Sequence, residues 1–339
     1  MTLRAGKLPT ARGSVPRIVG KKREKLVFVV FLGENGAQGD RNRDSIKEKE
    51  MNDVAKKKGR LDLINMKKNG EQMTWVTAYD FPMASFAEAA GMDMILVGDS
   101  LGMITLGYQG TIPVTMEDCI SHCKAVRRGA PNTFVMGDMP FGSYQVSDAD
   151  AVANAVRFLK EADMDAIKLE GGVRVKSRIR AIADAGILVC GHIGLTPQSS
   201  GPLGGFKAQG LDPESARYVI EDALAVEESG AFALLVEAVP PELTQFLAKK
   251  LTIPVYSIGA GGPCDGQLLI CGDMIGMFQA FTPKFVKVYA NVAEIVTKAF
   301  KEYVDDVHTG KFPGDEHCYH VRKGMEEEYA AMLKEYEDR

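Results

Sequence analysis

The feature that most constrains the fold is a series of eight short apolar runs, most of which end in polar or glycine residues. They occupy residues 73–80, 94–100, 133–140, 166–172, 187–194, 233–240, 254–262 and 266–273. Near-continuous apolar runs are typical of parallel strands that are covered on both faces. Helical patterns follow most of the runs, and this alternation indicates a parallel α/β sheet.

The segments between the runs carry recognisable helix starts. Ser147 or Asp148 is the expected N-cap of one helix, and Asp212 with Pro213 begins another. Eight strand–helix units in 339 residues favour a closed (β/α)8 TIM barrel over an open doubly wound sheet. The gap between the last two runs is too short for a normal helix. We expect the glycine-rich segment 195–210 to form a loop over the site.

The two ends of the chain differ from this pattern. Residues 1–50 are basic and rich in Gly, Arg and Lys, so we interpret them as a disordered extension or as sequence translated from too early a start. Residues 51–318 form the predicted catalytic barrel. The acidic segment 319–339 is expected to form a short exposed helix.

Charge and composition limit the partners and the compartment. The net charge of −4 gives no electrostatic reason to expect nucleic acid. The apolar run 26–32 is shorter than the roughly 20 residues that span a membrane, and no cleavage-site pattern follows it. The six cysteines form no CxxC motif, and Cys119, His122 and Cys123 lack a second cluster that would complete a metal site. We therefore expect reduced thiols in a cytoplasmic protein without a membrane partner.

Three of the runs lead into acids: Asp99, Asp138 and Glu170. Each acid alone could be a helix cap or stabilise a loop. In a barrel of this class, however, the C-terminal ends of the strands meet at the active site. Converging carboxylates repel one another unless a cation intervenes, and oxygen ligands favour a hard ion such as Mg²⁺. The sequence thus predicts a Mg²⁺ site, without excluding Mn²⁺ or Co²⁺.

Other polar residues lie at the same strand ends. Lys168 points to the same face as Glu170, where it could form a structural ion pair or bind an anionic substrate. His192 could be a structural hydrogen-bonding residue or take part in the reaction. Glu237 follows three apolar residues and is suited to proton transfer, although a salt-bridged carboxylate is the alternative. A metal beside a lysine and the Ser100 hydroxyl suits enolate chemistry on a small 2-oxoacid.

Nine motifs in order resemble the ketopantoate hydroxymethyltransferase family, over about residues 58 to 318. They are TAYDFPMA, VGDSLGM, LGYQGTIPVTMEDCISH, GDMPFGSYQVS, AIKLEGG, GHIGLTPQ, GAFALLVEAVP, IGAGGPCDGQLLI and FPGDEH. That family belongs to the phosphoenolpyruvate mutase and isocitrate lyase superfamily of barrels. The resemblance implies transfer of a hydroxymethyl group from 5,10-methylenetetrahydrofolate to 3-methyl-2-oxobutanoate through a metal-stabilised enolate. The product, 2-dehydropantoate, belongs to pantothenate and coenzyme A synthesis.

The resemblance also implies roles for particular residues. Asp99, Asp138 and Glu170 match the metal-site acids, with some contacts passing through water. The substrate-binding residues are matched by Asp99, Ser100, Asp138 and Lys168, with His192 near the substrate. Glu237 matches the proton acceptor. Family members are typically homodecamers, so we expect a homo-oligomer.

Two alternatives compete with this interpretation. The segment Cys190-Gly191-His192 superficially resembles a motif of isocitrate lyases, so a sibling enzyme that cleaves C–C or P–C bonds in a small 2-oxoacid is one alternative. A non-catalytic barrel is the other, but the predicted acids, Lys168 and Glu237 are all present. The chain departs from the family at Gly272-Asp273, where His-Asp is usual, and this bears on local loop or folate contacts.

Overall fold

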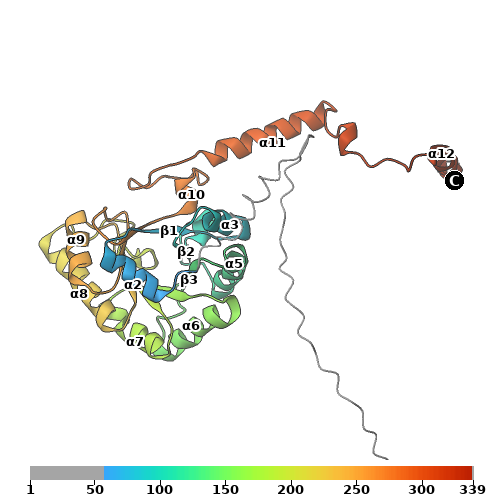
Figure 1. Cartoon of the computed structure of the whole chain (residues 1–339). Coiled ribbons are helices and arrows are strands. Elements are labelled where there is room, and N and C mark those ends of the chain that lie inside the picture. Colours follow the sequence, from blue (N-terminus) through green and yellow to red (C-terminus); the bar gives the residue numbers. More distant parts are fainter. Residues whose placement is uncertain (1–56, 338–339) are drawn as a thin grey trace, which may run out of the picture. The chain divides into compact units, whose positions relative to one another are not determined.

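The computed structural model describes residues 57–337, and its eight strands form a closed parallel barrel in sequence order (Figure 1). The strands are β1 (Met73–Thr77), β2 (Met94–Val97), β3 (Phe134–Asp138), β4 (Ala166–Glu170), β5 (Val189–Gly194), β6 (Ala233–Glu237), β7 (Val255–Ile258) and β8 (Gly266–Leu269). Each of the eight apolar runs contains one strand. The predicted (β/α)8 TIM barrel is therefore confirmed.

Helices follow most of the strands. They are α2 (Arg60–Asn69), α3 (Phe81–Ala89), α4 (Leu101–Ile104), α5 (Met116–Gly129), α6 (Asp148–Ala162), α7 (Lys176–Asp184), α8 (Pro213–Glu228), α9 (Pro241–Lys250), α10 (Cys271–Met274), α11 (Val292–His308) and α12 (Glu326–Glu337). Ser147 is the N-cap of α6, and its hydroxyl accepts the N–H of Asp150. Asp212 caps α8, with Pro213 at its first position. As expected, no helix separates β7 from β8.

Two apolar layers hold the barrel together. One fills its interior, and Leu63 of α2 joins this layer with no exposed surface. The other lies between the strands and the surrounding helices, where Phe158 of α6 packs directly against β3. A Cβ atom at Gly137 would lie 2.3 Å from the Phe158 ring, so this strand position has room only for glycine.

Strand register brings the predicted site residues to one end of the barrel. Asp138 pairs with Lys168 across β3 and β4, and Glu170 pairs with His192 across β4 and β5. Glu237 is the last residue of β6. Because all eight strands are parallel, these residues share the C-terminal mouth, where active sites of such barrels lie.

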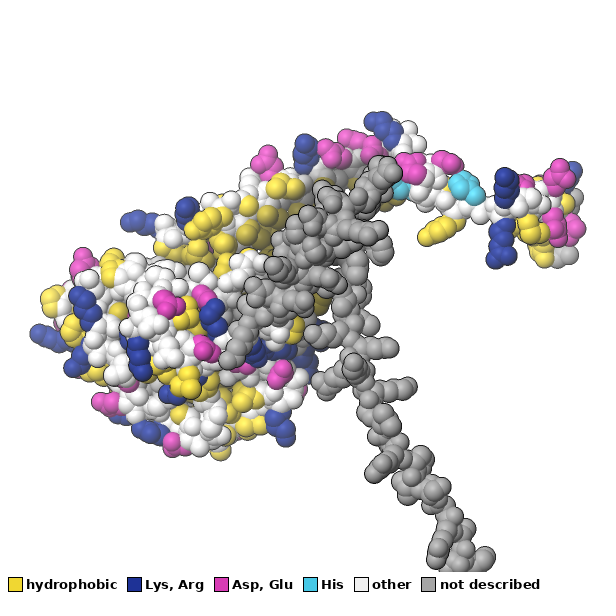
Figure 2. Space-filling view, viewed as in Figure 1, with side chains coloured by type: hydrophobic (Ala, Val, Ile, Leu, Met, Phe, Trp, Pro, Cys, Tyr) yellow, Lys and Arg dark blue, Asp and Glu magenta, His cyan; other side chains and the backbone are white. Residues whose placement is uncertain are grey.

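The C-terminal part of the chain carries an exposed amphipathic helix, α11. None of the residues of α11 is buried, although apolar side chains recur along one face and gather along the helix in Figure 2. Ile295, Phe300 and Tyr303 are 65%, 67% and 57% exposed. Helix α12 is likewise fully exposed and falls within the acidic tail.

Some predictions are not tested by these elements. The interpretation of residues 1–50 lies outside the described residues, and the boundary at residue 318 stays a prediction. A search of the described residues for helices with the length and apolar character of a membrane span finds none.

Candidate active site

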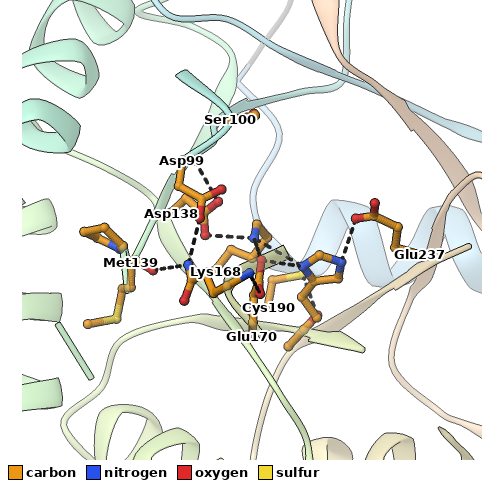
Figure 3. A network of polar contacts seen from close by, with 12 residues as sticks. Asp99, Ser100, Asp138, Met139, Lys168, Glu170, Cys190 and Glu237 are labelled. Carbon is orange, nitrogen blue, oxygen red and sulfur yellow. Dashed lines mark hydrogen bonds and ion pairs between the residues drawn. The ribbon is translucent and has the colours of Figure 1, made fainter. Parts of the chain in front are cut away.

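Three buried carboxylates surround one buried lysine at the mouth of the barrel (Figure 3). Asp99, Asp138 and Glu170 are 4%, 1% and 1% exposed. Lys168 Nζ lies 2.8 Å from Asp138 Oδ1 and 3.9 Å from Glu170 Oε1. Its single positive charge offsets only part of the negative charge that three ionised acids would carry.

The burial of this cluster alters its titration. Burial raises the pKa of Asp99, Asp138 and Glu170, and the attraction of Lys168 opposes the rise. For Lys168, burial lowers the pKa, but Asp138, Glu170 and Asp99 outweigh this effect and raise it. The lysine therefore stays an ammonium ion at neutral pH. A second cation would stabilise the ionised form of all three acids.

The donor chemistry of the cluster fits a divalent cation. Glu170 Oε1 is buried and accepts no hydrogen bond, so one carboxylate oxygen is left for an external ligand. Within residues 57–337, no group of three His, Cys, Asp or Glu residues is arranged to hold an ion by itself. Mg²⁺ commonly takes only one or two protein carboxylates and fills its other positions with water and substrate. The site matches that mode of binding.

Gln198 connects the acids from the loop that follows β5. Its Nε2 donates to Asp99 Oδ2 at 2.9 Å and to the Met139 carbonyl at 3.0 Å. Its backbone N–H donates to Glu170 Oε2 at 2.9 Å, and Tyr144 Oη donates to its Oε1 at 2.6 Å. Sequence reasoning assigned no role to Gln198 or Tyr144. The available signal was their presence in two of the quoted motifs, GHIGLTPQ and GDMPFGSYQVS.

The capping interpretation of Asp99 is wrong, because its carboxylate accepts from Gln198 and the short helix α4 begins after Ser100. Asp138 does stabilise the neighbouring strand end, since its Oδ2 accepts the Asp99 N–H at 3.0 Å. Ser100 Oγ lies 2.8 Å from Tyr79 Oη, and the serine side chain makes no cap bond. Ser100 lines the cavity, with its hydroxyl paired to Tyr79.

His192 lies between the acid cluster and Glu237. Its Nε2 is 3.1 Å from Glu237 Oε2, and its Nδ1 is 3.4 Å from both Lys168 Nζ and Glu170 Oε1. Burial and the Lys168 charge lower the pKa of His192, so the ring is neutral near pH 7. Figure 3 shows Glu237 on the side of the site away from Asp99 and Asp138. Only 14% of the Glu237 side chain is exposed.

One cavity of about 580 Å³ brings all the predicted site residues together. Its polar end contains Asp99, Ser100, Asp138, Lys168, Glu170, His192 and Glu237. Apolar side chains line the rest, including Phe206 from the loop after β5 and Phe278, Phe281 and Phe285 from the segment after α10. The loop at residues 195–210 borders the site, as expected.

Comparison with known proteins identifies the family. A family model described as ketopantoate hydroxymethyltransferase matches residues 58–315. The chain belongs to this family. A protein of Alkaliphilus metalliredigens named 3-methyl-2-oxobutanoate hydroxymethyltransferase is 74% identical over 283 residues, which cover 84% of this chain and all of that protein. A protein of the same name from Clostridium novyi is 52% identical over 76% of this chain and 94% of its own length.

Membership in the ketopantoate hydroxymethyltransferase family confirms the predicted class of enzyme, a transferase of hydroxymethyl groups. Solved structures share the fold at low identity. A phosphoenolpyruvate phosphomutase from Streptomyces platensis subsp. rosaceus has a TM-score of 0.52 at 15% identity, covering 83% of this chain and 99% of its own. A phosphonopyruvate hydrolase solved with oxalate and Mg²⁺ has a TM-score of 0.50 at 14% identity, covering 83% of this chain and 98% of its own.

The structure also weakens the alternative of a lyase-like sibling enzyme, which the segment Cys190-Gly191-His192 had suggested. Cys190 is fully buried in the barrel interior, and burial raises the pKa of its thiol to about 12. A thiol in this state is neither ionised nor accessible at neutral pH. The likeness of Cys190-Gly191-His192 to the lyase motif therefore carries no matching chemistry.

Proposed function

We propose that this chain transfers a hydroxymethyl group from 5,10-methylenetetrahydrofolate to 3-methyl-2-oxobutanoate, giving 2-dehydropantoate for pantothenate synthesis. The observation that supports this most strongly is one cavity with a buried lysine among three carboxylates at one side and the His192–Glu237 pair at the other. This arrangement provides charge for binding an oxoacid and a separate base for its proton. The relatives' name supports the same substrate.

Substrate binding uses the polar end of the cavity. Lys168 supplies a fixed positive charge for the anionic oxoacid, and Ser100 supplies a hydroxyl donor. Asp99, Asp138 and Glu170 are the residues that would hold a divalent cation, with Mg²⁺ as the proposed ion and some contacts through water. When bound, such a cation supplies Lewis-acid polarisation of the oxoacid carbonyl.

Proton removal is assigned to Glu237. The Glu237 carboxylate accepts the proton from C3 of the oxoacid, and the resulting carbon nucleophile forms a bond with the one-carbon unit of the folate. The bonds from that carbon to the folate nitrogens break and water supplies the hydroxyl oxygen, so 2-dehydropantoate and tetrahydrofolate are released. Neutral His192, 3.1 Å from Glu237 Oε2, orients the carboxylate without neutralising it by a full positive charge. A protonated histidine would weaken the base, so the lowered pKa of His192 supports this assignment.

The test is exchange of the C3 hydrogen of 3-methyl-2-oxobutanoate with deuterated water, which requires no folate. We expect wild-type protein with Mg²⁺ to catalyse exchange and Glu237→Gln to reduce its rate by at least about a hundredfold, the usual contribution of a general base. Binding of the oxoacid should persist in Glu237→Gln, as measured by calorimetry. Exchange at the wild-type rate in this variant would refute the role of Glu237.

We also propose a cytoplasmic homo-oligomer, a decamer by the family resemblance. The apolar face of α11 supports the oligomer, because a helix with an exposed apolar stripe is typical of a subunit contact. Native mass spectrometry of the purified chain measures the number of subunits directly. A stable monomer at micromolar concentration would contradict this proposal.

A further inference from the structure

Asp273 is an acid in the cavity wall that the proposed chemistry leaves unused. It lies on α10, just after β8, and is 7% exposed. Among residues 57–337, no donor forms a hydrogen bond or ion pair with its carboxylate. Burial raises the pKa of Asp273 to about 6. A desolvated carboxylate without a partner is costly, and such groups in cavities commonly meet a ligand.

The chain that follows Asp273 folds so that aromatic side chains line the same cavity. The Gly272 carbonyl accepts the N–H groups of Met277 at 2.9 Å and Phe278 at 3.0 Å, which closes a turn. This turn brings Phe278 into the same cavity wall as Asp273. Phe278 and Phe281 then pack edge to face, with ring centroids 5.8 Å apart.

The local structure accounts for glycine at position 272. A Cβ atom there would lie 2.8 Å from Ile104 Cγ2, and Ile104 also lines the cavity. A larger residue would push Ile104 aside or displace the turn. Gly272 therefore allows the wall that carries Asp273 to pack closely against α4.

The charge of Asp273 disfavours the oxoacid as its ligand. The oxoacid is an anion with no N–H donors, so a carboxylate would repel it. The pterin of a folate is flat, and its 2-amino-4-oxopyrimidine edge carries two neighbouring donors, N3–H and the 2-amino group. A carboxylate can accept both in a paired arrangement, and aromatic side chains contact a flat ring over a large area.

We propose that Asp273 binds the pterin of the folate co-substrate through these two donors, with Phe278 and Phe281 against the ring. This inference rests on the proposed function. The cavity volume of about 580 Å³ lies within the usual range for small-molecule sites, which leaves room for an oxoacid and a pterin together. Asp273 and the aromatic residues thus form a folate subsite beside the oxoacid subsite.

The test compares wild-type protein with Asp273→Asn by titrating tetrahydrofolate and measuring its Kd by calorimetry. The asparagine keeps the shape of the side chain but presents an N–H group to one of the pterin donors. We expect the Kd to rise about 10- to 100-fold, as for loss of hydrogen bonds to a charged group. Glu242→Gln, an exposed acid outside the cavity, is the control and should leave the Kd within about twofold.

A folate analogue without the 2-amino group provides a second comparison. Wild-type protein should bind the analogue much more weakly than tetrahydrofolate, whereas Asp273→Asn should discriminate little between them. Equal discrimination by both proteins, or an unchanged Kd in Asp273→Asn, would overturn the inference. Loss of folate-free deuterium exchange in Asp273→Asn would also overturn it, because Asp273 would then belong to the oxoacid subsite.

The two proposals fail in different ways. The Kd measurements require no turnover, so they test Asp273 independently of catalysis. Absence of exchange in the wild-type protein would refute the proposed function instead.

Discussion

At the scale of single residues, Gln198 organises the acids without being ionisable itself. It holds Asp99 with its amide and Glu170 with its backbone N–H, while Tyr144 fixes the amide orientation. The residues that orient metal ligands often affect metal affinity nearly as much as the ligands do. Gln198 is therefore expected to influence the proposed metal site through Asp99 and Glu170.

We predict that Gln198→Leu weakens Mg²⁺ binding by about 10- to 100-fold, because the Asp99 carboxylate loses its amide donor. Calorimetric titration of Mg²⁺ measures this without turnover. Gln245→Leu, at an exposed position of α9, is the matched control and should bind Mg²⁺ normally. Normal Mg²⁺ affinity in Gln198→Leu would show that the loop does not position the acids.

A second residue-scale prediction concerns pH and Asp273. Its folded pKa of about 6 lies above its ordinary value of 3.8, so the folded state loses stability as the pH rises between these values. Asparagine does not ionise, so Asp273→Asn removes this pH-dependent loss of folding stability. We expect the variant to be more stable than wild type by about 1–2 kcal/mol at pH 7.5, after allowing for solvent in the cavity, and to have little advantage at pH 4.

Urea unfolding at the two pH values measures this difference. Because the acids at Asp99, Asp138 and Glu170 titrate in both proteins, their contributions cancel in the comparison. A constant difference between the proteins at both pH values would contradict the assigned desolvation of Asp273.

At the scale of elements, helix α6 packs closely against β3 one residue before Asp138. A Cβ atom at Gly137 would lie 2.3 Å from Phe158, which has no exposed surface. We predict that Gly137→Ala lowers the free energy of unfolding by about 1–3 kcal/mol, since the core must shift to accept the methyl group.

The same substitution in a Phe158→Leu background tests the cause. A smaller side chain at position 158 relieves the clash, so Gly137→Ala should cost less there than in the wild-type background. Urea unfolding of the four proteins gives the coupling free energy. A coupling near zero would mean that the cost of Gly137→Ala arises elsewhere.

At the scale of the whole molecule, the apolar face of α11 supports the proposed assembly into an oligomer. We predict that Phe300→Asp shifts the protein to smaller assemblies, because a charge at a residue that is 67% exposed here would be buried in a subunit contact. Lys298→Asp, on the charged side of α11, also introduces an aspartate and should leave assembly unchanged. Native mass spectrometry distinguishes these outcomes, and an unchanged assembly in Phe300→Asp would exclude this face as the contact.

The sequence by itself determined the barrel and the strand-end residues of its site. Each apolar run was long enough for one strand, and parallel strands bring their C-terminal ends to one mouth whatever the detailed packing. Asp99, Asp138, Lys168, Glu170, His192 and Glu237 were therefore predictable from position alone, and the structure places them around one cavity.

Only the tertiary structure decided which loop residues join them. Gln198 bonds to Asp99 across 99 residues and to Tyr144 across 54, and no local pattern records such contacts. Within the described part of the chain, the Asp273 carboxylate has no hydrogen-bond or ion-pair partner. This likewise depends on the folded arrangement around the turn at Gly272. Strand periodicity is a local property of the chain, whereas loop contacts and desolvation depend on segments that meet only after folding.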